Sequence, residues 1–108
     1  MSFRLLLTDE AADLLFAIAE RYAETSQSLE VAIAWYDGFI EDLESLEQNP
    51  FRCAVAPENG LFDFEVRELL YGSGKQLTHR AIFRIVENRI EVLTIRHHAQ
   101  RPLQHGDL

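Results

Sequence analysis

The residues of this chain best suited to chemistry are arginines and histidines gathered in its second half. Between Arg67 and Arg101 there are seven basic and three acidic side chains, together with three histidines. Lys75 is the only lysine, so nearly every cation is a guanidinium, a planar group that binds phosphates and carboxylates through paired hydrogen bonds. The pattern favours recognition of a macromolecule by arginine. The alternative is that these arginines form the solvated face of an antiparallel sheet.

The remaining reactive residue types do not indicate a metal or a cofactor. His97 and His98 are adjacent, so their side chains diverge in an extended chain, and His105 stands alone in a short tail; neither spacing resembles a two-histidine helical site. Cys53 is the only cysteine, which excludes an internal disulfide and a thiolate zinc cluster and is typical of a reducing compartment. We therefore expect no cofactor and no metal.

The composition is that of a single acidic domain. The 108 residues are 47% apolar and 26% charged, close to the globular average. The formal charge is -8, and residues 1–50 hold 11 acidic against two basic side chains. This sign argues against a general nucleic-acid-coating protein. The apolar run after Arg4 is too short for a signal peptide or a membrane span, so we expect a cytoplasmic protein.

Helical periodicity dominates the first half, after a short apolar run over residues 3–7 that is compatible with a buried strand. Thr8 is placed as the N-cap of one helix and Ser28 as the N-cap of a second, and apolar residues recur every three or four positions behind each cap. Pro50 ends the second helix. The short connection between the helices predicts an antiparallel helical hairpin.

In the second half the period changes to two. Residues 62–66 alternate apolar and polar side chains and predict a half-buried strand, while residues 71–74 are expected to form a turn or flexible loop. Two further alternating runs, 80–86 and 90–95, flank Glu87-Asn88, where the tolerance of asparagine for positive φ favours a two-residue hairpin turn. Such a turn pairs Arg84 with Glu91, Phe83 with Val92 and Ile82 with Leu93. In this single register, opposite charges face each other and apolar residues face apolar residues.

These elements predict an α+β domain of β-α-α-β-β-β topology, with the helical hairpin packed on an antiparallel sheet. Residues 1–103 are assigned to this single domain. Residues 104–108 are assigned to a short polar C-terminal tail.

Motifs between residues 66 and 101 resemble the RelE/ParE toxin superfamily. They are Val66-Arg67-Glu68-Leu69, Thr78-His79-Arg80-Ala81-Ile82-Phe83, Ile90-Glu91-Val92-Leu93 and Arg96-His97-His98. The order of elements up to about Leu103 agrees with the small α+β fold of that family. The resemblance implies a type II toxin, encoded beside a small antitoxin that binds and neutralises it. ParE-like members poison DNA gyrase, whereas RelE-like members cut messenger RNA in the ribosomal decoding site.

A ribonuclease of the YoeB type is one interpretation of this resemblance. Glu58, Arg80 and His98 resemble that branch's carboxylate, arginine and terminal histidine, although its final tyrosine corresponds to Ala99. The resemblance then implies that Glu58 is the base for the 2′-hydroxyl, Arg80 the phosphate clamp and His98 the acid.

The alternation of side chains between the two faces of a strand complicates this interpretation. Uninterrupted pairing puts Arg80 on one face with Ile95 and His97, while His98 points to the other face. A bulge or bend near Arg96 is then needed to bring His98 to Arg80.

The acidic charge favours the ParE-like branch, because a decoding-site nuclease must dock on dense phosphate and a protein target such as gyrase makes no such demand. We therefore favour a non-enzymatic toxin over a metal-independent endoribonuclease. A relative that has lost toxicity and persists as an interaction module is the third alternative. The expected target-contact surface consists of Arg67, Arg80, Arg84, Arg96, His97 and Arg101.

The antitoxin is expected to cover exposed apolar parts of the helical hairpin or to add a strand at a sheet edge. Basic residues in that partner would complement the acidic helices.

Overall fold

The computed structural model describes residues 2–73 and 76–108. Its elements are strand β1 (Arg4–Leu7), helices α1 (Asp9–Ser26) and α2 (Leu29–Glu44), and strands β2 (Arg67–Ser73), β3 (Gln76–Val86) and β4 (Arg89–His97). Short 3-10 turns at Ser45–Glu47, Pro50–Arg52 and Asn59–Leu61 lie between α2 and β2. The predicted α+β element order is confirmed.

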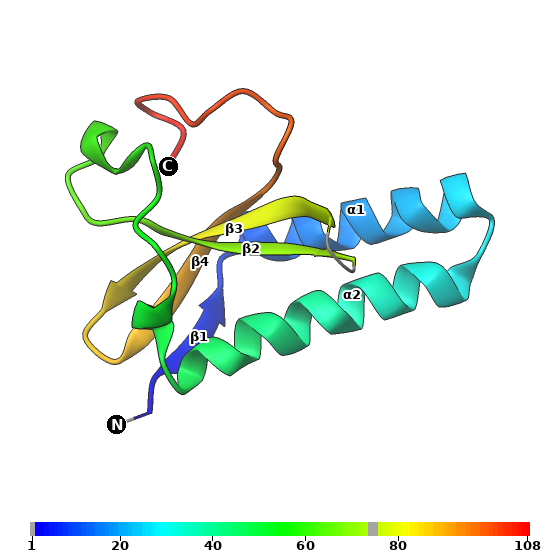
Figure 1. Cartoon of the computed structure of the whole chain (residues 1–108), viewed down its shortest axis with the longest axis horizontal. Coiled ribbons are helices and arrows are strands. Elements are labelled where there is room, and N and C mark those ends of the chain that lie inside the picture. Colours follow the sequence, from blue (N-terminus) through cyan, green and yellow to red (C-terminus); the bar gives the residue numbers. More distant parts are fainter. Residues whose placement is uncertain (1, 74–75) are drawn as a thin grey trace.

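The strands form one sheet in the order β1-β4-β3-β2. Strands β2, β3 and β4 make an antiparallel meander, whereas β1 lies parallel to β4 with Leu5 opposite Ile90. A parallel pair needs a long crossover, and the helical hairpin is part of it. The two helices lie side by side against the sheet (Figure 1).

Both predicted helix caps are confirmed. The Thr8 hydroxyl accepts a hydrogen bond from the Ala11 amide at 3.2 Å and donates to the Val92 carbonyl at 2.8 Å, which joins the start of α1 to β4. The Ser28 hydroxyl accepts from the Val31 amide at 3.2 Å. Each cap satisfies an amide that the first helical turn leaves unpaired.

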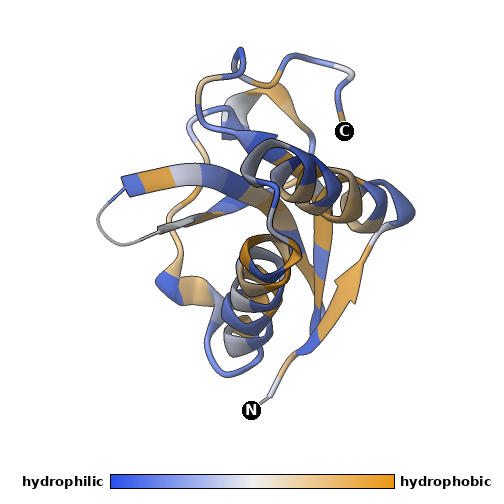
Figure 2. Cartoon of the chain, turned by 90° about the vertical axis from the view of Figure 1, so that its right-hand side faces the viewer, coloured by the Kyte–Doolittle hydropathy of each residue, from blue (hydrophilic) through white to orange (hydrophobic). Residues whose placement is uncertain are grey.

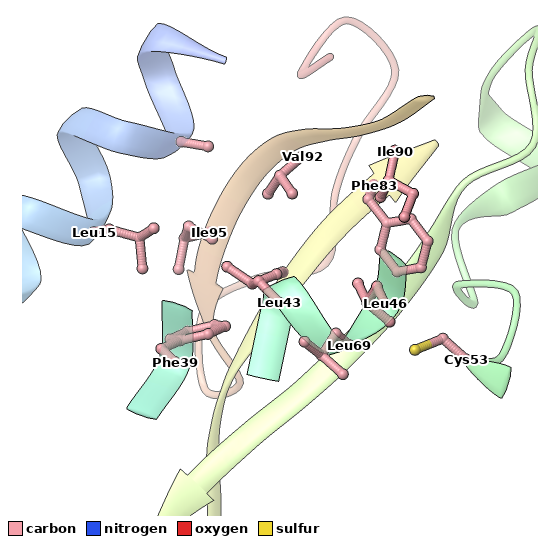
Figure 3. Close-up of a cluster of buried hydrophobic side chains, with 12 residues drawn as sticks. Leu15, Phe39, Leu43, Leu46, Cys53, Leu69, Phe83, Ile90, Val92 and Ile95 are labelled. Atoms are coloured by element: carbon pink, nitrogen blue, oxygen red, sulfur yellow. The ribbon is translucent and has the colours of Figure 1, made fainter. Parts of the chain in front are cut away.

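The main core lies between the helices and the sheet. The buried residues of this core are at most 7% exposed. Figure 2 shows hydrophobic and hydrophilic residues mixed along both helices, whereas β1, next to the N-terminus, is mostly hydrophobic. Figure 3 shows the largest of the core side chains converging from both helices and three strands: Leu15, Phe39, Leu43, Leu69, Phe83, Val92 and Ile95. Successive side chains of a strand alternate between faces, so Ala81 and Phe83 point to the helices and Ile82 points away from them.

A second, smaller apolar cluster lies on the sheet face away from the helices, which we call the outer face. It consists of Ala56, Val66, Ile82 and Leu103, with Leu108 packed partly against it. The loop before β2 and the C-terminal segment therefore cover the outer face.

The strand predicted over residues 62–66 is wrong. Phe62 and Phe64 lie in the loop before β2 with their rings stacked 6.0 Å apart, and the strand begins only at Arg67, opposite Phe83. In that register residues 62–66 would fall opposite residues 84–88, where β3 ends and the chain turns. The alternation of apolar residues arises instead because the aromatic side chains pack on the outer cluster.

The turn predicted over residues 71–74 is also wrong for its first three residues, which belong to β2; residue 74 lies outside the described residues. Gly72 marks a register irregularity in the β2–β3 pairing. A side chain there would collide with the backbone of Gln76, so the strands approach closely because the residue is glycine.

The β3–β4 hairpin is confirmed at its turn and corrected beyond it. Arg84 pairs with Glu91 and Phe83 with Val92, as expected, but Ile82 pairs with Thr94 because a bulge shifts the register. Leu93 is therefore the extra residue. The left-handed backbone in the turn belongs to Glu87, with φ 58°, and not to Asn88.

Candidate functional site

The bulge in β4 decides which side chains meet on the outer face. With the register shifted by one, Arg80 pairs with Arg96 and His79 with His97. The expectation that Arg80 shares a face with Ile95 and His97 is therefore wrong. The bulge lies at Leu93, three residues before the expected position near Arg96 and directly after the part of β4 that pairs with β1.

As a result, Glu58, Arg80 and His98 line one pocket on the outer face. The His98 amide donates to the Thr78 carbonyl at 2.8 Å, which extends the ladder by one residue and brings the imidazole to the side of Arg80. Glu58 comes from the loop just before the 3-10 turn Asn59–Leu61. We call this the outer-face pocket; Glu68, Leu61, Leu70, Pro57 and Pro102 also line it.

Glu58 is held tightly inside this pocket. Its side chain is only 7% exposed, and Oε2 accepts hydrogen bonds from the Arg80 guanidinium and from the Leu103 amide. Burial alone would raise the pKa of this carboxyl, but the bonds from Arg80 and Leu103 outweigh it and hold the pKa below its usual range. The carboxylate is therefore ionised near neutral pH and poorly basic.

Arg80 is neutralised by two carboxylates. Its Nη2 binds Glu58, and its Nη1 donates to Glu68 Oε1 at 2.9 Å from the neighbouring strand. The side chain is 13% exposed. An arginine engaged in this way has little capacity to clamp a phosphate, because both ends of its guanidinium fork are occupied.

Three of the other arginines expected to contact a target are also paired within the molecule. Arg67 binds Glu65 at 2.9 Å, Arg84 binds Glu91 at 2.7 Å, and Arg101 binds Asp107 at 2.8 Å.

Arg96 differs from these arginines. Across residues 2–73 and 76–108 it makes no salt bridge, and its Nη2 donates to the Arg101 carbonyl at 2.7 Å. It lines a groove between α1 and the end of β4, together with Arg21 and His97. Among the described residues, Arg96 is therefore the one arginine of the expected contact surface without a salt bridge, and Glu10 and Asp107 line the same groove.

Sequence reasoning missed two features. Glu68 was not recognised as a site residue because the strand that carries it was placed too early; correct placement of β2 puts it beside Arg80. His79, 3% exposed, is buried against the rings of Tyr22, Trp35 and His97. Burial, together with the nearby charges of His97 and His98, lowers its pKa to about 4.

The exposed side of the helical hairpin carries an apolar groove. Phe16, Leu29 and Ile33 line it and are each at least half exposed, at 60%, 68% and 50%. Glu20 and Asp37 stand in the same groove. An acidic rim around exposed apolar side chains is typical of an interaction surface.

Among the described residues, no group of three or more histidine, cysteine, aspartate or glutamate side chains is placed to hold a metal ion. None of the described helices is long and apolar enough to span a membrane. Cys53 is buried, and burial raises the pKa of its thiol above the ordinary value, as expected of an unreactive core cysteine.

Comparison with known proteins identifies the family. Residues 5–102 match the family model described as ParE toxin of type II toxin-antitoxin system, parDE. A search of curated proteins found no match. Among solved structures, a chain of the chromosomal ParDE toxin-antitoxin system from P. aeruginosa is 25% identical, with a TM-score of 0.70, covering 89% of this chain and 96% of that one. Because the family model spans most of the sequence, the chain belongs to the ParE toxin family of type II toxin-antitoxin systems.

Proposed function

We propose that this toxin acts in the cytoplasm by binding DNA gyrase and inhibiting it without catalysis. The observation that carries the proposal is the state of the outer-face pocket. Arg80 forms ion pairs with both Glu58 and Glu68, so the pocket has an excess of negative charge. It has no free guanidinium to bind a phosphate. A protein target is compatible with that charge, and membership of the ParE family favours gyrase.

A ribosome-dependent endoribonuclease is the second candidate, since Glu58, Arg80 and His98 do lie in one pocket. The details oppose it. The expected base is an ionised carboxylate of lowered pKa whose Oε2 is already bonded, and general bases work best with a pKa near the operating pH. The acidic chain would also have to approach dense ribosomal phosphate.

Induced expression with two separate readouts divides the candidates. We expect growth arrest, loss of supercoiling by purified gyrase on addition of the toxin, and intact messenger RNA in a translating extract. Cleaved messenger RNA with unaffected supercoiling would reverse the assignment. Growth without arrest, despite a folded protein that binds its antitoxin, would support the interaction module.

Three substitutions sharpen this test. Glu58→Ala, Arg80→Ala and His98→Ala should leave gyrase inhibition in place wherever the variant remains folded, as judged by circular dichroism. A nuclease would lose roughly a hundredfold or more in rate with each general acid or base removed. Loss of toxicity in folded variants of all three would contradict the gyrase proposal.

The contact with gyrase is proposed to involve the end of β4, where Arg96 and His97 line the groove beside α1. Arg96→Ala should weaken gyrase inhibition by roughly tenfold, since an unpaired arginine is a frequent centre of binding energy. Arg84→Ala is the matched control, because Arg84 is bound to Glu91 and stacked over Phe64. Equal losses for both variants would contradict this placement.

The antitoxin is proposed to dock on the exposed groove of the helical hairpin with a basic amphipathic segment. The groove offers apolar side chains from both helices, and acidic residues surround it; such a surface fits a helix with cationic flanks. The occupant is the product of the short reading frame expected beside the toxin gene.

Two matched substitutions in α2 test this docking. Ile33, 50% exposed, lines the groove, and Val31, 48% exposed, does not. Ile33→Glu should weaken antitoxin binding by roughly tenfold or more in calorimetry, whereas Val31→Glu should change it by less than about threefold. Raising the salt concentration should also weaken wild-type binding. Equal effects of the two substitutions would place the antitoxin elsewhere.

A further inference from the structure

One buried polar atom in the outer-face pocket has no hydrogen-bond partner. Glu58 Oε2 is bonded to Arg80 and to the Leu103 amide, whereas Oε1 has no hydrogen-bond partner in another residue among residues 2–73 and 76–108. The backbone amide of Glu58 itself also helps to lower the pKa of the carboxyl. The side chain is 93% buried, since only 7% of it is exposed. An unpaired buried carboxylate oxygen is costly, and a donor that reached it from the pocket that Glu58 lines would remove that cost.

The remaining polar side chains that line the pocket with Glu58 and Arg80 are His98, Gln100 and Glu68. His98 Nδ1 lies 3.1 Å from the Thr78 carbonyl, which can only accept, so Nδ1 donates there, and Gln100 Oε1 accepts from the His97 amide at 2.7 Å. Glu68 gives Oε1 to Arg80 and, as a carboxylate, has lone pairs for further donors. The charged acceptors of the pocket are therefore the oxygens of its two carboxylates.

The net charge of the pocket determines which kind of hydrogen-bond donor it favours. Two carboxylates, Glu58 and Glu68, face one guanidinium, Arg80, so one negative charge is left over. An anion would meet this excess and find the Arg80 donors occupied. A cationic donor would be attracted by it.

The walls of the pocket are apolar. Leu61 and Leu70 line it and remain 45% and 44% exposed, with Pro57 and Pro102 nearby. An apolar wall leading to an acidic floor suits a side chain with a hydrocarbon stem and a charged end. We infer that the outer-face pocket binds an arginine or lysine side chain presented by a protein partner.

Nuclear magnetic resonance with single side-chain probes tests this inference. N-acetyl-arginine methylamide or N-acetyl-lysine methylamide, added to the uniformly 15N-labelled full chain, should shift the amide signals of Glu58, Glu68 and His98. The dissociation constant should be roughly millimolar, as one side chain without a surrounding interface provides. The citrulline analogue, which keeps the shape of arginine without its charge, should not bind.

Matched substitutions locate the effect. Glu68→Gln should weaken binding of the cationic probe by roughly fivefold or more, since it removes a charge-assisted acceptor. Glu65→Gln removes the same charge from a residue outside the pocket, bound to Arg67, and should change the affinity by less than about twofold. Glu58→Gln serves as a second variant if its spectrum remains that of a folded protein.

Two outcomes would overturn the inference. One is the absence of pocket shifts with both cationic probes. The other is binding of inorganic phosphate at the same amides, which would make the pocket an anion site. Neither measurement involves gyrase, so failure here is distinguishable from failure of the proposed function.

Discussion

The two faces of the sheet are covered in different ways. The helical face is apolar: Leu15, Phe39, Leu43, Phe83 and Val92 are all fully buried there. The outer face has only a small apolar cluster, and arginine–carboxylate pairs surround it. A loop with short 3-10 turns and the C-terminal segment cover it, in place of long helices.

The two faces of the sheet therefore contribute differently: the helical face stabilises the fold, and the outer face carries charged groups whose chemistry can vary. Removal of apolar surface from water is the main source of folding free energy, so the helical face carries most of the stability. The outer face can exchange ion pairs without altering that core, and the same fold can therefore serve different targets. In this chain the arginine of the outer-face pocket, Arg80, is bonded to both Glu58 and Glu68.

The largest expected effect comes from the helical face. Phe39 is fully buried, stacked 4.3 Å from the ring of Tyr71 and packed edge-on against Trp35. Phe39→Ala should lower the free energy of unfolding by about 4 kcal/mol, measured by urea denaturation. Phe16→Ala, in the exposed groove, should change it by less than about 0.5 kcal/mol. Similar losses would mean that the groove belongs to the core.

Substitution of Arg80 tests how much the outer face contributes to the free energy of unfolding. Arg80→Met leaves the Glu58 carboxylate buried without its partner, which should cost about 3 kcal/mol of unfolding free energy. Arg84→Met removes a more exposed pair, with an arginine side chain 36% exposed, and should cost about 1 kcal/mol or less.

The double variant Glu58→Gln/Arg80→Met should be more stable than Arg80→Met alone, because no buried charge is left unpaired. If Arg80→Met cost no more than Arg84→Met, the buried network would add nothing to the fold.

The predictability of these two regions from sequence also differed. The helices and the hairpin turn were predictable because their signals are local: caps at Thr8 and Ser28, and the facing of Arg84 and Glu91 across a two-residue turn. The start of β2 was not. The alternation of apolar and polar residues over 62–66 indicates that one side of this segment packs on an apolar surface. It does not indicate whether the segment pairs with a strand, because that depends on where β3 ends.

Sequence reasoning placed Glu58, Arg80 and His98 in one hypothetical site, but it could not reveal how these side chains are bonded. Resemblance brought together Glu58, Arg80 and His98, and the structure places all three in one pocket. It could not reveal that Arg80 is occupied, because Glu68 comes from the misplaced strand and the Leu103 amide from the C-terminal segment. No local sequence signal marks the bulge at Leu93, which directly follows the part of β4 that pairs with β1.

His79 gives the next effect, at the edge of the helical core. Its pKa is about 4 in the folded protein because of burial and the neighbouring His97 and His98, against an ordinary value of 6.5. Below pH 6.5 the unfolded chain binds a proton that the native state does not, so stability falls as the pH drops from 6.5 toward 4. We expect about 2 kcal/mol to be lost between pH 7.5 and pH 5.

Urea denaturation at several pH values measures this loss, and His79→Gln should abolish its share of the slope between pH 6.5 and pH 5. His105→Gln, in an exposed tail position, should leave the slope as in the wild type. An unchanged slope in His79→Gln would show that another group controls the dependence on pH.

The smallest effect is expected in the C-terminal segment, where Arg101 and Asp107 form a two-bond pair at 2.8 and 3.4 Å. The hydrogen bonds from Arg101 and from the Gln104 amide lower the pKa of Asp107 to about 2, yet the pair stands in solvent, where such attraction is screened. Asp107→Asn should therefore leave the urea midpoint unchanged. Hydrogen exchange should accelerate at the Gln104 amide, which donates a hydrogen bond to Asp107. It should not accelerate at the Leu103 amide, which donates to Glu58. Faster exchange at both would mean that the solvent-exposed pair, and not the buried Glu58, fixes the segment on the outer face.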